Sequence, residues 1–372
     1  MTAVLATSLD ELVEHVPAWD ELAVRCGLPY CAPAWMLAWW RALAPAGSEL
    51  RVVLVLDEGR LTAVFPFHRA GPPARLRVWR HLCAGFCTRI GPVAVPGCER
   101  DAASAAARAI SGPHGPDVLA LEGLPAGSPW PVLLRDAWPG RLPPYLHRDL
   151  FMPTPAARLD GGFEAWLARR RGGVRRDTLR RRRRLEEHGV RVRRAAGAEL
   201  EAGVAALCRT YRARWEHRGG SDRLVPGLEA MLVAAGRELG DRFDLWLLES
   251  DGAAMAAHLF VAAGTELSAW GGGFQPECAR YAPTVVLRLA AIERAASAGI
   301  ARVEFGEGTQ PDKVSFADDE IGVDWATLLP RTRRYPLARA QLLPKHARWW
   351  VRDALRRLPP PVQERLRRIR PT

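Results

Sequence analysis

The sequence predicts an α/β fold in which one unit of helices and strands occurs twice. The chain has 372 residues, 48% of them hydrophobic, which is enough for two domains with full cores. Both halves show the same order of predicted elements: helices, a hairpin, further strands, and then a helix and a strand. The two hairpins turn at similar sequences, Asp57-Glu58-Gly59 and Asp251-Gly252. We therefore expect units at residues 1–150 and 151–330, followed by a tail at 331–372.

The first half begins with a helix, which Ser8 and Glu11 introduce as a capping box. A second helix is predicted at 34–43, where clustered tryptophans indicate core packing. The segment 125–144 is rich in proline and glycine and is predicted to be a connector. The other predicted elements are strands at 51–56, 61–68, 76–81, 92–95 and 117–122 and a helix at 101–110.

The second half repeats this order. Helices are predicted at 163–171, 174–188, 200–217, 226–239 and 284–298, and strands at 243–249, 254–262, 266–272 and 301–305. After Ile321 the pattern weakens. Residues 331–370 contain thirteen Lys and Arg but only two acidic residues, which predicts one or two basic amphipathic helices.

The residues from Trp270 to Lys313 carry the most informative functional pattern. Gly271, Gly272 and Gly273 end a predicted strand, and a polar turn leads into the helix at 284–298. Glycine lets backbone N–H groups approach a phosphate, and a helix N-terminus favours negative charge, so this segment can bind an anion. The same pattern also fits a helix that crosses between two strands, with glycines needed only for the turn.

Composition limits the classes of function. The net charge of +12 favours anionic partners, although arginine replaces lysine almost everywhere and part of the excess reflects a GC-rich coding bias. Seven cysteines without a CxxC pair predict reduced thiols and no metal site. No signal peptide and no apolar stretch of membrane-spanning length is evident, so a cytoplasmic protein is expected.

Several short motifs, loose singly but in a fairly specific order, resemble those of a known family. The second half contains Phe163-x-x-Trp166-Leu167, the run Leu179 to Leu185 with Gly189, Tyr281-x-Pro283, and Glu304-Phe305-Gly306-x-Gly308 followed by Lys313. The first half contains Trp19-x-x-Leu22, Ala34-Trp35 and Phe65-Pro66-Phe67. Together, over about residues 10–325, they resemble the GNAT acyltransferases of the CelD-like group, associated with cellulose and other exopolysaccharide biosynthesis.

This resemblance implies two tandem GNAT-like units, as in Fem-type peptidyltransferases, each a mixed, mainly antiparallel sheet flanked by helices. In GNAT folds the fourth and fifth strands separate, the pantetheine arm of acyl-CoA lies between them, and its pyrophosphate meets the next helix. Here those strands are 266–272 and 301–305. The chain departs from the family where the helix opens without glycine, and where Glu304 replaces the more usual Asp.

The resemblance also suggests roles for individual residues. Glu304 is the candidate general base, Tyr281 the proton donor to the leaving thiolate, and Lys313 the group that holds a phosphate or an anionic acceptor. The residues expected to bind acetyl-CoA or another acyl-CoA are Trp270, Gly271, Gly272, Gly273, Arg280, Ala282, Pro283 and Thr284. Each residue also has a purely structural interpretation, and His258 is expected to be a core histidine.

The expected function is transfer of an acyl group, in the first place acetyl, from acyl-CoA to a sugar, amino sugar or polysaccharide precursor. A Fem-like transferase that uses aminoacyl-tRNA is the alternative that the arginine run at 169–184 suggests. Other nucleic-acid binding is disfavoured, since the run lacks interleaved aromatic residues. A third alternative is a degenerate scaffold for a membrane polysaccharide synthase, with the basic tail against anionic lipid.

Overall fold

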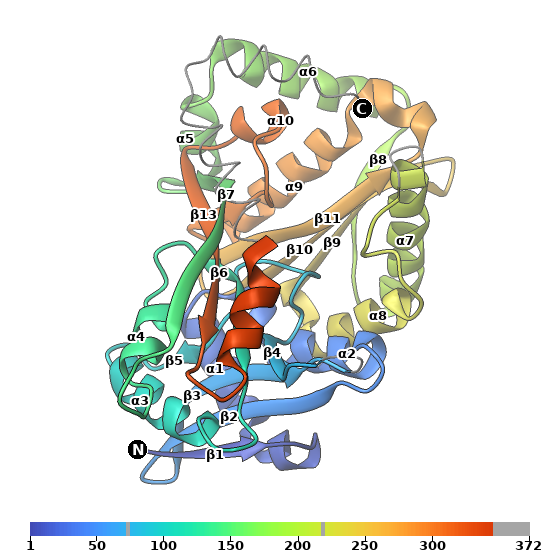
Figure 1. Ribbon diagram of the computed structural model, residues 1–372. Coiled ribbons are helices and arrows are strands. Elements are labelled where there is room, and N and C mark those ends of the chain that lie inside the picture. Colours follow the sequence, from blue (N-terminus) through green and yellow to red (C-terminus); the bar gives the residue numbers. More distant parts are fainter. Residues whose placement is uncertain (72–74, 217–219, 345–372) are drawn as a thin grey trace.

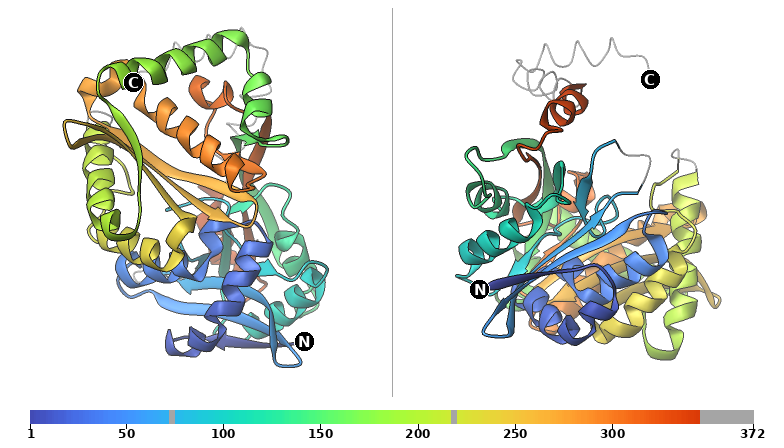
Figure 2. Two further views of the ribbon diagram at one scale, coloured as in Figure 1. Left: turned by 180° about the vertical axis from the view of Figure 1, so that it is seen from behind. Right: turned by 60° about the horizontal axis from the view of Figure 1, so that its bottom comes forward.

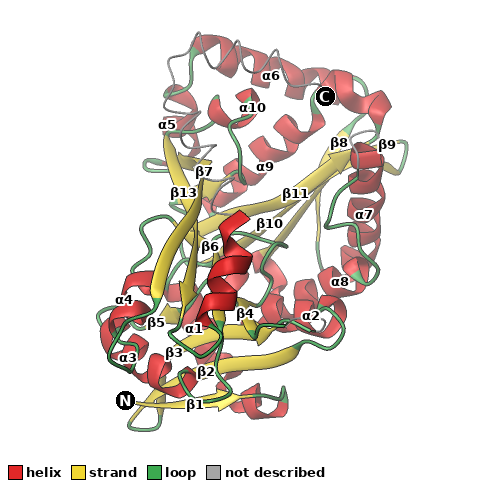
Figure 3. Cartoon of the chain, in the orientation of Figure 1, coloured by secondary structure: helices red, strands yellow, loops and turns green. Residues whose placement is uncertain are grey.

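A computed structural model describes residues 1–71, 75–216 and 220–344 of the chain (Figure 1). The described strands form one large sheet, in the order β1-β2-β3-β4-β6-β13-β7-β12-β11-β10-β9-β8, and β5 pairs with β3 beside this path (Figure 3). All neighbouring strands are antiparallel except β4 with β6 and β11 with β12. The expected mixed, mainly antiparallel sheet is therefore confirmed.

The first half forms one end of this sheet. Its strands are β1 (Thr2–Ala6), β2 (Glu49–Asp57), β3 (Arg60–Arg69), β4 (Val78–His81), β5 (Val93–Ala94) and β6 (Val118–Pro125). Its helices are α1 (Val16–Arg25), α2 (Pro33–Leu43), α3 (Glu99–Ile110) and α4 (Trp130–Asp136), with 3-10 turns at Asp10–His15 and Pro29–Cys31. Helix α4 lies within the segment predicted to be a connector, and its buried Trp130 and Leu134 fill the first-half core.

The second half forms the other end. Its strands are β8 (Arg191–Ala195), β9 (Phe243–Ser250), β10 (Ala253–Ala263), β11 (Glu266–Phe274) and β12 (Arg302–Glu304). Its helices are α5 (Gly162–Ala168), α6 (Gly172–Glu187), α7 (Leu200–Glu216), α8 (Leu228–Leu239), α9 (Pro283–Ser297) and α10 (Pro311–Val314). Short 3-10 turns occur at Gly197–Glu199, Gly240–Arg242 and Pro276–Tyr281.

Two long strands join the halves. β13 (Asp319–Leu329) pairs with β6 on one side and with β7 (Tyr145–Arg158) on the other. β7 runs through residue 150, the expected boundary between the units, and its far end pairs with β12. The sheet of the first half therefore passes without interruption into that of the second. Neither strand was expected: Pro153 and Pro155 interrupt the strand pattern of β7, and acidic residues interrupt that of β13.

The largest core cluster also spans both halves. Trp35 and Met36 on α2 lie in the same cluster as Met231 and Leu232 on α8, and as Trp270 on β11. Figure 2 shows α2 beside α8 at this boundary, while α9 covers the opposite face of the second-half sheet and α6 packs on α9. In the described part of the chain no helix is long and apolar enough to cross a bilayer.

Candidate active site

The site begins where two parallel strands separate. β11 and β12 are paired over Glu266↔Arg302, Leu267↔Val303 and Ser268↔Glu304, after which β12 ends and β11 continues to Phe274. The backbone N–H groups of Phe305 and Gly308 then donate to the carbonyl oxygens of Pro155 and Pro153, each at 3.0 Å. These bonds draw the chain after β12 toward β7. The expected separation of the two strands is therefore confirmed.

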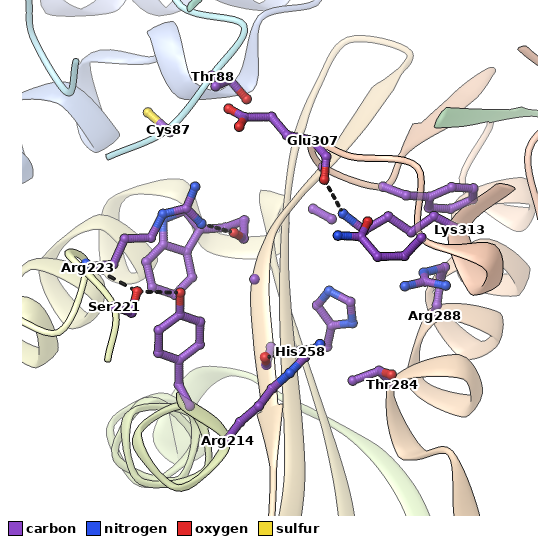
Figure 4. Close-up of a pocket in the computed structure, with 18 of the residues that line it drawn as sticks. Cys87, Thr88, Arg214, Ser221, Arg223, His258, Thr284, Arg288, Glu307 and Lys313 are labelled. Atoms are coloured by element: carbon purple, nitrogen blue, oxygen red, sulfur yellow. Dashed lines mark hydrogen bonds between the residues drawn. The ribbon is translucent and has the colours of Figure 1, made fainter. Parts of the chain in front are cut away.

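A pocket of about 380 Å³ lies in this gap, and both halves of the chain line it (Figure 4). Thr284 and Arg288 of α9 and Lys313 of α10 lie on one side, whereas Ser221 and Arg223 lie on the side of α7. The first half contributes Tyr30, Cys87 and Thr88. The Tyr30 hydroxyl donates to the Ser268 carbonyl at 3.0 Å and so fixes the first half against the base of the gap.

The wall formed by β11 contains an irregularity. The register between β10 and β11 shifts so that Trp270 is an extra residue in the strand, which is the pattern of a β-bulge. Beyond the point where β12 leaves, the Trp270 carbonyl accepts from Arg223 at 2.6 Å and the Gly272 carbonyl accepts from Arg214 at 2.9 Å. Arginine side chains thus occupy backbone acceptors near the gap and bring positive charge to the pocket.

Lys313 is the cationic group on the opposite wall. Its Nζ donates to the Glu307 carbonyl at 2.7 Å. Burial and the nearby Arg288 lower the pKa of Lys313 to about 8, although Glu304 and Asp312 oppose that shift. A lysine whose pKa lies near the pH of the cell can exchange a proton with a substrate.

Arg288 of α9 and His258 of β10 also line the pocket. Arg288 is 2% exposed and both of its Nη atoms lie 3.2 Å from one Asp312 carboxylate oxygen. Burial and the charge of Arg288 lower the pKa of His258 well below its usual range, so the imidazole is neutral near pH 7. A methyl group at Gly272 would lie 2.6 Å from the Ala257 carbonyl oxygen and 2.9 Å from the His258 ring, so the glycine makes room for both.

Glu304 lies beside the pocket and does not line it. Its side chain is buried, and Oε1 accepts the backbone N–H of Gly306. Burial raises the pKa of Glu304 above that of an ordinary glutamate, while Arg89 and the Gly306 N–H act in the opposite direction. In this position the carboxyl group orients the loop that carries Glu307, and it has no direct access to a substrate in the pocket.

The predicted cofactor residues separate into two groups. Trp270, Gly271, Gly272 and Thr284 line the pocket together with Lys313, whereas Gly273, Arg280, Tyr281, Ala282 and Pro283 do not. Gly273 faces α7, where an added methyl group would lie 2.2 Å from the Thr210 carbonyl oxygen. Arg280 donates to the Tyr281 hydroxyl at 2.9 Å, and the Tyr281 ring lies by His188.

The start of α9 provides few backbone donors. Ala282 caps the helix with φ +49°, and Pro283 follows it as the first helical residue and has no N–H. The N–H groups of Val285 and Val286 both donate to the Ala282 carbonyl. Only the Thr284 N–H in this turn has no backbone acceptor, so the expected anion site at this helix depends mainly on neighbouring side chains.

Sequence reasoning missed most of the polar and charged lining. Tyr30, Thr88 and Arg223 reach the pocket through the tertiary fold and carry no local signal. Arg288 could have been found, because it falls on the apolar face that Val285 and Leu289 define on its own helix, and an unpaired charge is costly there.

The chain is similar to known proteins in sequence over one segment and in fold over both halves. Residues 172–314 match the family model described as an acetyltransferase (GNAT) domain. Three solved structures share the fold: FemX, the C-terminal DUF2156 domain of a protein from Agrobacterium fabrum assigned as a lysylphosphatidylglycerol synthetase, and L-PGS from Bacillus licheniformis. No protein of curated function is similar enough in sequence to count as a relative.

These similarities cover both halves of the chain. FemX has a TM-score of 0.60 and 11% identity over 88% of this chain and 97% of its own. The Agrobacterium domain has a TM-score of 0.57 and 12% identity over 89% of this chain and 96% of its own. L-PGS has a TM-score of 0.51 and 10% identity over 90% of this chain and 95% of its own. Residues 172–314 thus match a GNAT acetyltransferase domain, which indicates a transferase, and the similarity of fold to these structures extends over both halves of the chain.

Proposed function

We propose that this transferase moves an acyl group, in the first place acetyl, from an acyl-CoA to a sugar, amino sugar or polysaccharide precursor. The observation that carries the proposal is the pocket between the separated ends of β11 and β12, with a half-buried Lys313 of lowered pKa on its wall. Acyl-CoA donors are made in the cytoplasm, which is where the proposal places the protein. The CelD-like motifs support a glycan acceptor.

In this proposal Lys313 carries the proton. Neutral Lys313 accepts the proton of the attacking hydroxyl or amine, and the resulting ammonium returns it to the leaving thiolate, so the proton is conserved over the reaction. The ammonium form also stabilises the negative charge that develops on the carbonyl oxygen. The Glu307 carbonyl orients Nζ, and Glu304 orients the loop that carries this carbonyl.

The lining has the charge needed for a phosphorylated donor. Arg214, Arg223 and Arg288 are cationic, as is Lys313 when it is protonated, against Glu307 and Asp312 in the same lining. A thioester supplies the activated carbonyl, and arginine is well suited to hold phosphate oxygens. Arg288 and Arg214, with the Thr284 N–H, are the groups we assign to that task.

Acetyl-CoA binding and turnover test the proposal directly. We expect millimolar acetyl-CoA to raise the melting temperature, and amino sugars or sugars to release free CoA thiol from it in the presence of the enzyme. An Arg288→Gln variant should lose most of the thermal shift. Absence of both the shift and the thiol release across acyl-CoA donors would overturn the proposal.

A second candidate is favoured by the start of α9. Pro283 and the bonded N–H groups of Val285 and Val286 leave little backbone for a pyrophosphate, and α6 exposes several arginines to solvent. Aminoacyl-tRNA is a donor that suits such a surface. Transfer of a radiolabelled amino acid from charged tRNA, with no acetyl-CoA binding, would favour this candidate over the first.

A further inference from the structure

A second basic site, which shares no lining residue with the transferase pocket, lies at the corner where β13 leaves the sheet. A groove of about 1080 Å³ runs between the loops around residues 110–117, 138–142 and 330–334. Its lining contains six arginines, which we call the arginine groove: Arg69, Arg77, Arg141, Arg331, Arg333 and Arg334.

The positive charge of this groove is only partly balanced. Asp117 is the single acidic residue among its described lining residues, and it is shared by Arg77 at 2.8 Å and Arg334 at 3.5 Å. Arg69 pairs with Glu49 at 3.0 Å. Within the described ranges no carboxylate pairs with Arg141, Arg331 or Arg333, and all three are exposed.

Exposed leucines accompany these arginines. Leu142, which lines the groove, is 64% exposed, and Leu337 and Leu343, on the helix that follows it, are 37% and 54% exposed. That helix, at residues 335–344, projects from the body of the protein (Figure 2). Ala338 on its inner side is fully buried against Leu76 and neighbouring residues, so the helix is fixed in place.

We propose that this corner docks on a membrane surface that contains anionic phospholipid. Arginines that lack carboxylate partners attract acidic headgroups, and leucines beside them can enter the interface between headgroups and acyl chains. A nucleic acid would use the charge but not the leucines, because its recognition needs stacking or groove contacts. The proposal is independent of the reaction that the transferase pocket performs.

Vesicle partitioning of the full chain tests this assignment. We expect co-sedimentation with phosphatidylcholine vesicles containing about one-third phosphatidylglycerol, weakening as salt rises, and no co-sedimentation with pure phosphatidylcholine. Each arginine near an anionic surface contributes about fivefold to partitioning. The double variant Arg141→Gln, Arg333→Gln should therefore partition roughly 25-fold less.

A matched control removes the same charge elsewhere. The double variant Arg176→Gln, Arg183→Gln changes two exposed arginines of α6, and it should partition within about twofold of wild type. An equal loss in both double variants, or no loss in the groove variant, would overturn the proposal. A further double variant, Leu142→Ser with Leu337→Ser, tests the leucines. If it binds vesicles as wild type does, and wild type binds single-stranded RNA more tightly than it binds the vesicles, the groove is a polyanion site and the lipid assignment is wrong.

Discussion

Lys313 is one of only two lysines in a chain that otherwise uses arginine for its positive charge. That choice has a chemical meaning at a partly buried site, since an arginine stays charged whereas a lysine can release its proton when burial lowers its pKa. Its Nζ, with a pKa of about 8, contacts the Glu307 carbonyl in the wall of the pocket. This residue therefore allows the sharpest test of the chemistry.

We expect Lys313→Met to lower kcat/KM by about 100-fold or more, the usual contribution of a general base. In wild type, kcat/KM should rise with pH through about 8 as Lys313 loses its proton, and the variant should lack this rise. Lys313→Arg preserves the charge but holds its proton, so it should be equally inactive. A normal pH profile in the methionine variant would contradict the assignment.

The charge on Lys313 should also lower the stability of the folded protein. Because the pKa of Lys313 is lower in the folded state than in the unfolded chain, the unfolded state binds more protons between about pH 8 and 10.5. Wild-type stability should therefore rise across that window, and Lys313→Met should unfold at a higher temperature than wild type at pH 7. Thermal melts at pH 7 and 10 measure both effects.

Glu304 provides the complementary test. If Glu304 orients the loop at Gly306 and does not act as the base, the glutamine in Glu304→Gln still offers an oxygen to the Gly306 N–H. Activity should then fall by no more than about tenfold, which is far less than the loss expected when a general base is removed. Its pKa is raised by burial, so the charged carboxylate costs stability above that pKa, and the glutamine variant should be more stable at pH 8 than at pH 5 relative to wild type. A loss of about 1000-fold would identify Glu304 as the base instead.

At the scale of the elements, the glycines of β11 serve different purposes. Gly273 lies against the backbone of α7, where an added methyl group would meet Thr210 and Tyr211 backbone atoms at 2.2 and 2.3 Å. At Gly271 the nearest atom would be a Tyr211 ring carbon at 3.3 Å. The run that suggested a phosphate site is therefore needed in part for helix packing.

We expect Gly273→Ala to lower the free energy of unfolding by about 3 kcal/mol or more, because neither backbone can give way. Gly271→Ala, two residues earlier in β11, serves as the control and should lower the free energy of unfolding by about 1 kcal/mol or less. Urea unfolding of both variants gives the comparison. Equal stability of the two would show that α7 moves freely against β11.

The sequence was informative where an element is regular and local. The two hairpins and the helices α2, α7 and α9 lie close to their predicted ranges, because apolar periodicity sets each of them. β7 and β13 were missed because what makes them strands is their pairing with each other. The carbonyls of Pro155 and Pro153 accept the N–H groups of Phe305 and Gly308, so both prolines turn their backbone polar atoms away from β13 and leave the hydrogen bonds of that ladder intact.

The site was predicted to a similar extent. A pattern of strand, glycines, helix and strand locates the gap, and Trp270, Thr284 and Lys313 line it. Much of the other lining comes from α7, its following loop and the first half, at distances along the chain that no local pattern encodes. Only Arg288, a charge on an apolar helix face, left a detectable signal.

At the scale of the whole molecule, the two halves are joined in three ways. The sheet is continuous through β13 and β7. The largest core cluster contains side chains from both halves. The buried Arg89 of the first half reaches Glu266 at the start of β11, at 3.1 Å, and Arg302 of β12 binds the same carboxylate at 2.8 Å.

These connections predict that the halves unfold together. Phe65 is fully buried in β3 and lies in one core cluster with Ala326 and Leu328 of β13, so Phe65→Ala should cost about 3–5 kcal/mol and weaken β13 as well. Because β13 also holds β7, we expect amide protons of β10 and β11 to exchange faster in this variant, and calorimetry to show one transition. Val4→Ala, at a half-exposed position in β1, should change neither result. If β10 and β11 keep their wild-type protection while the first half loses its own, the halves are independent folding units and the shared sheet adds little cooperativity.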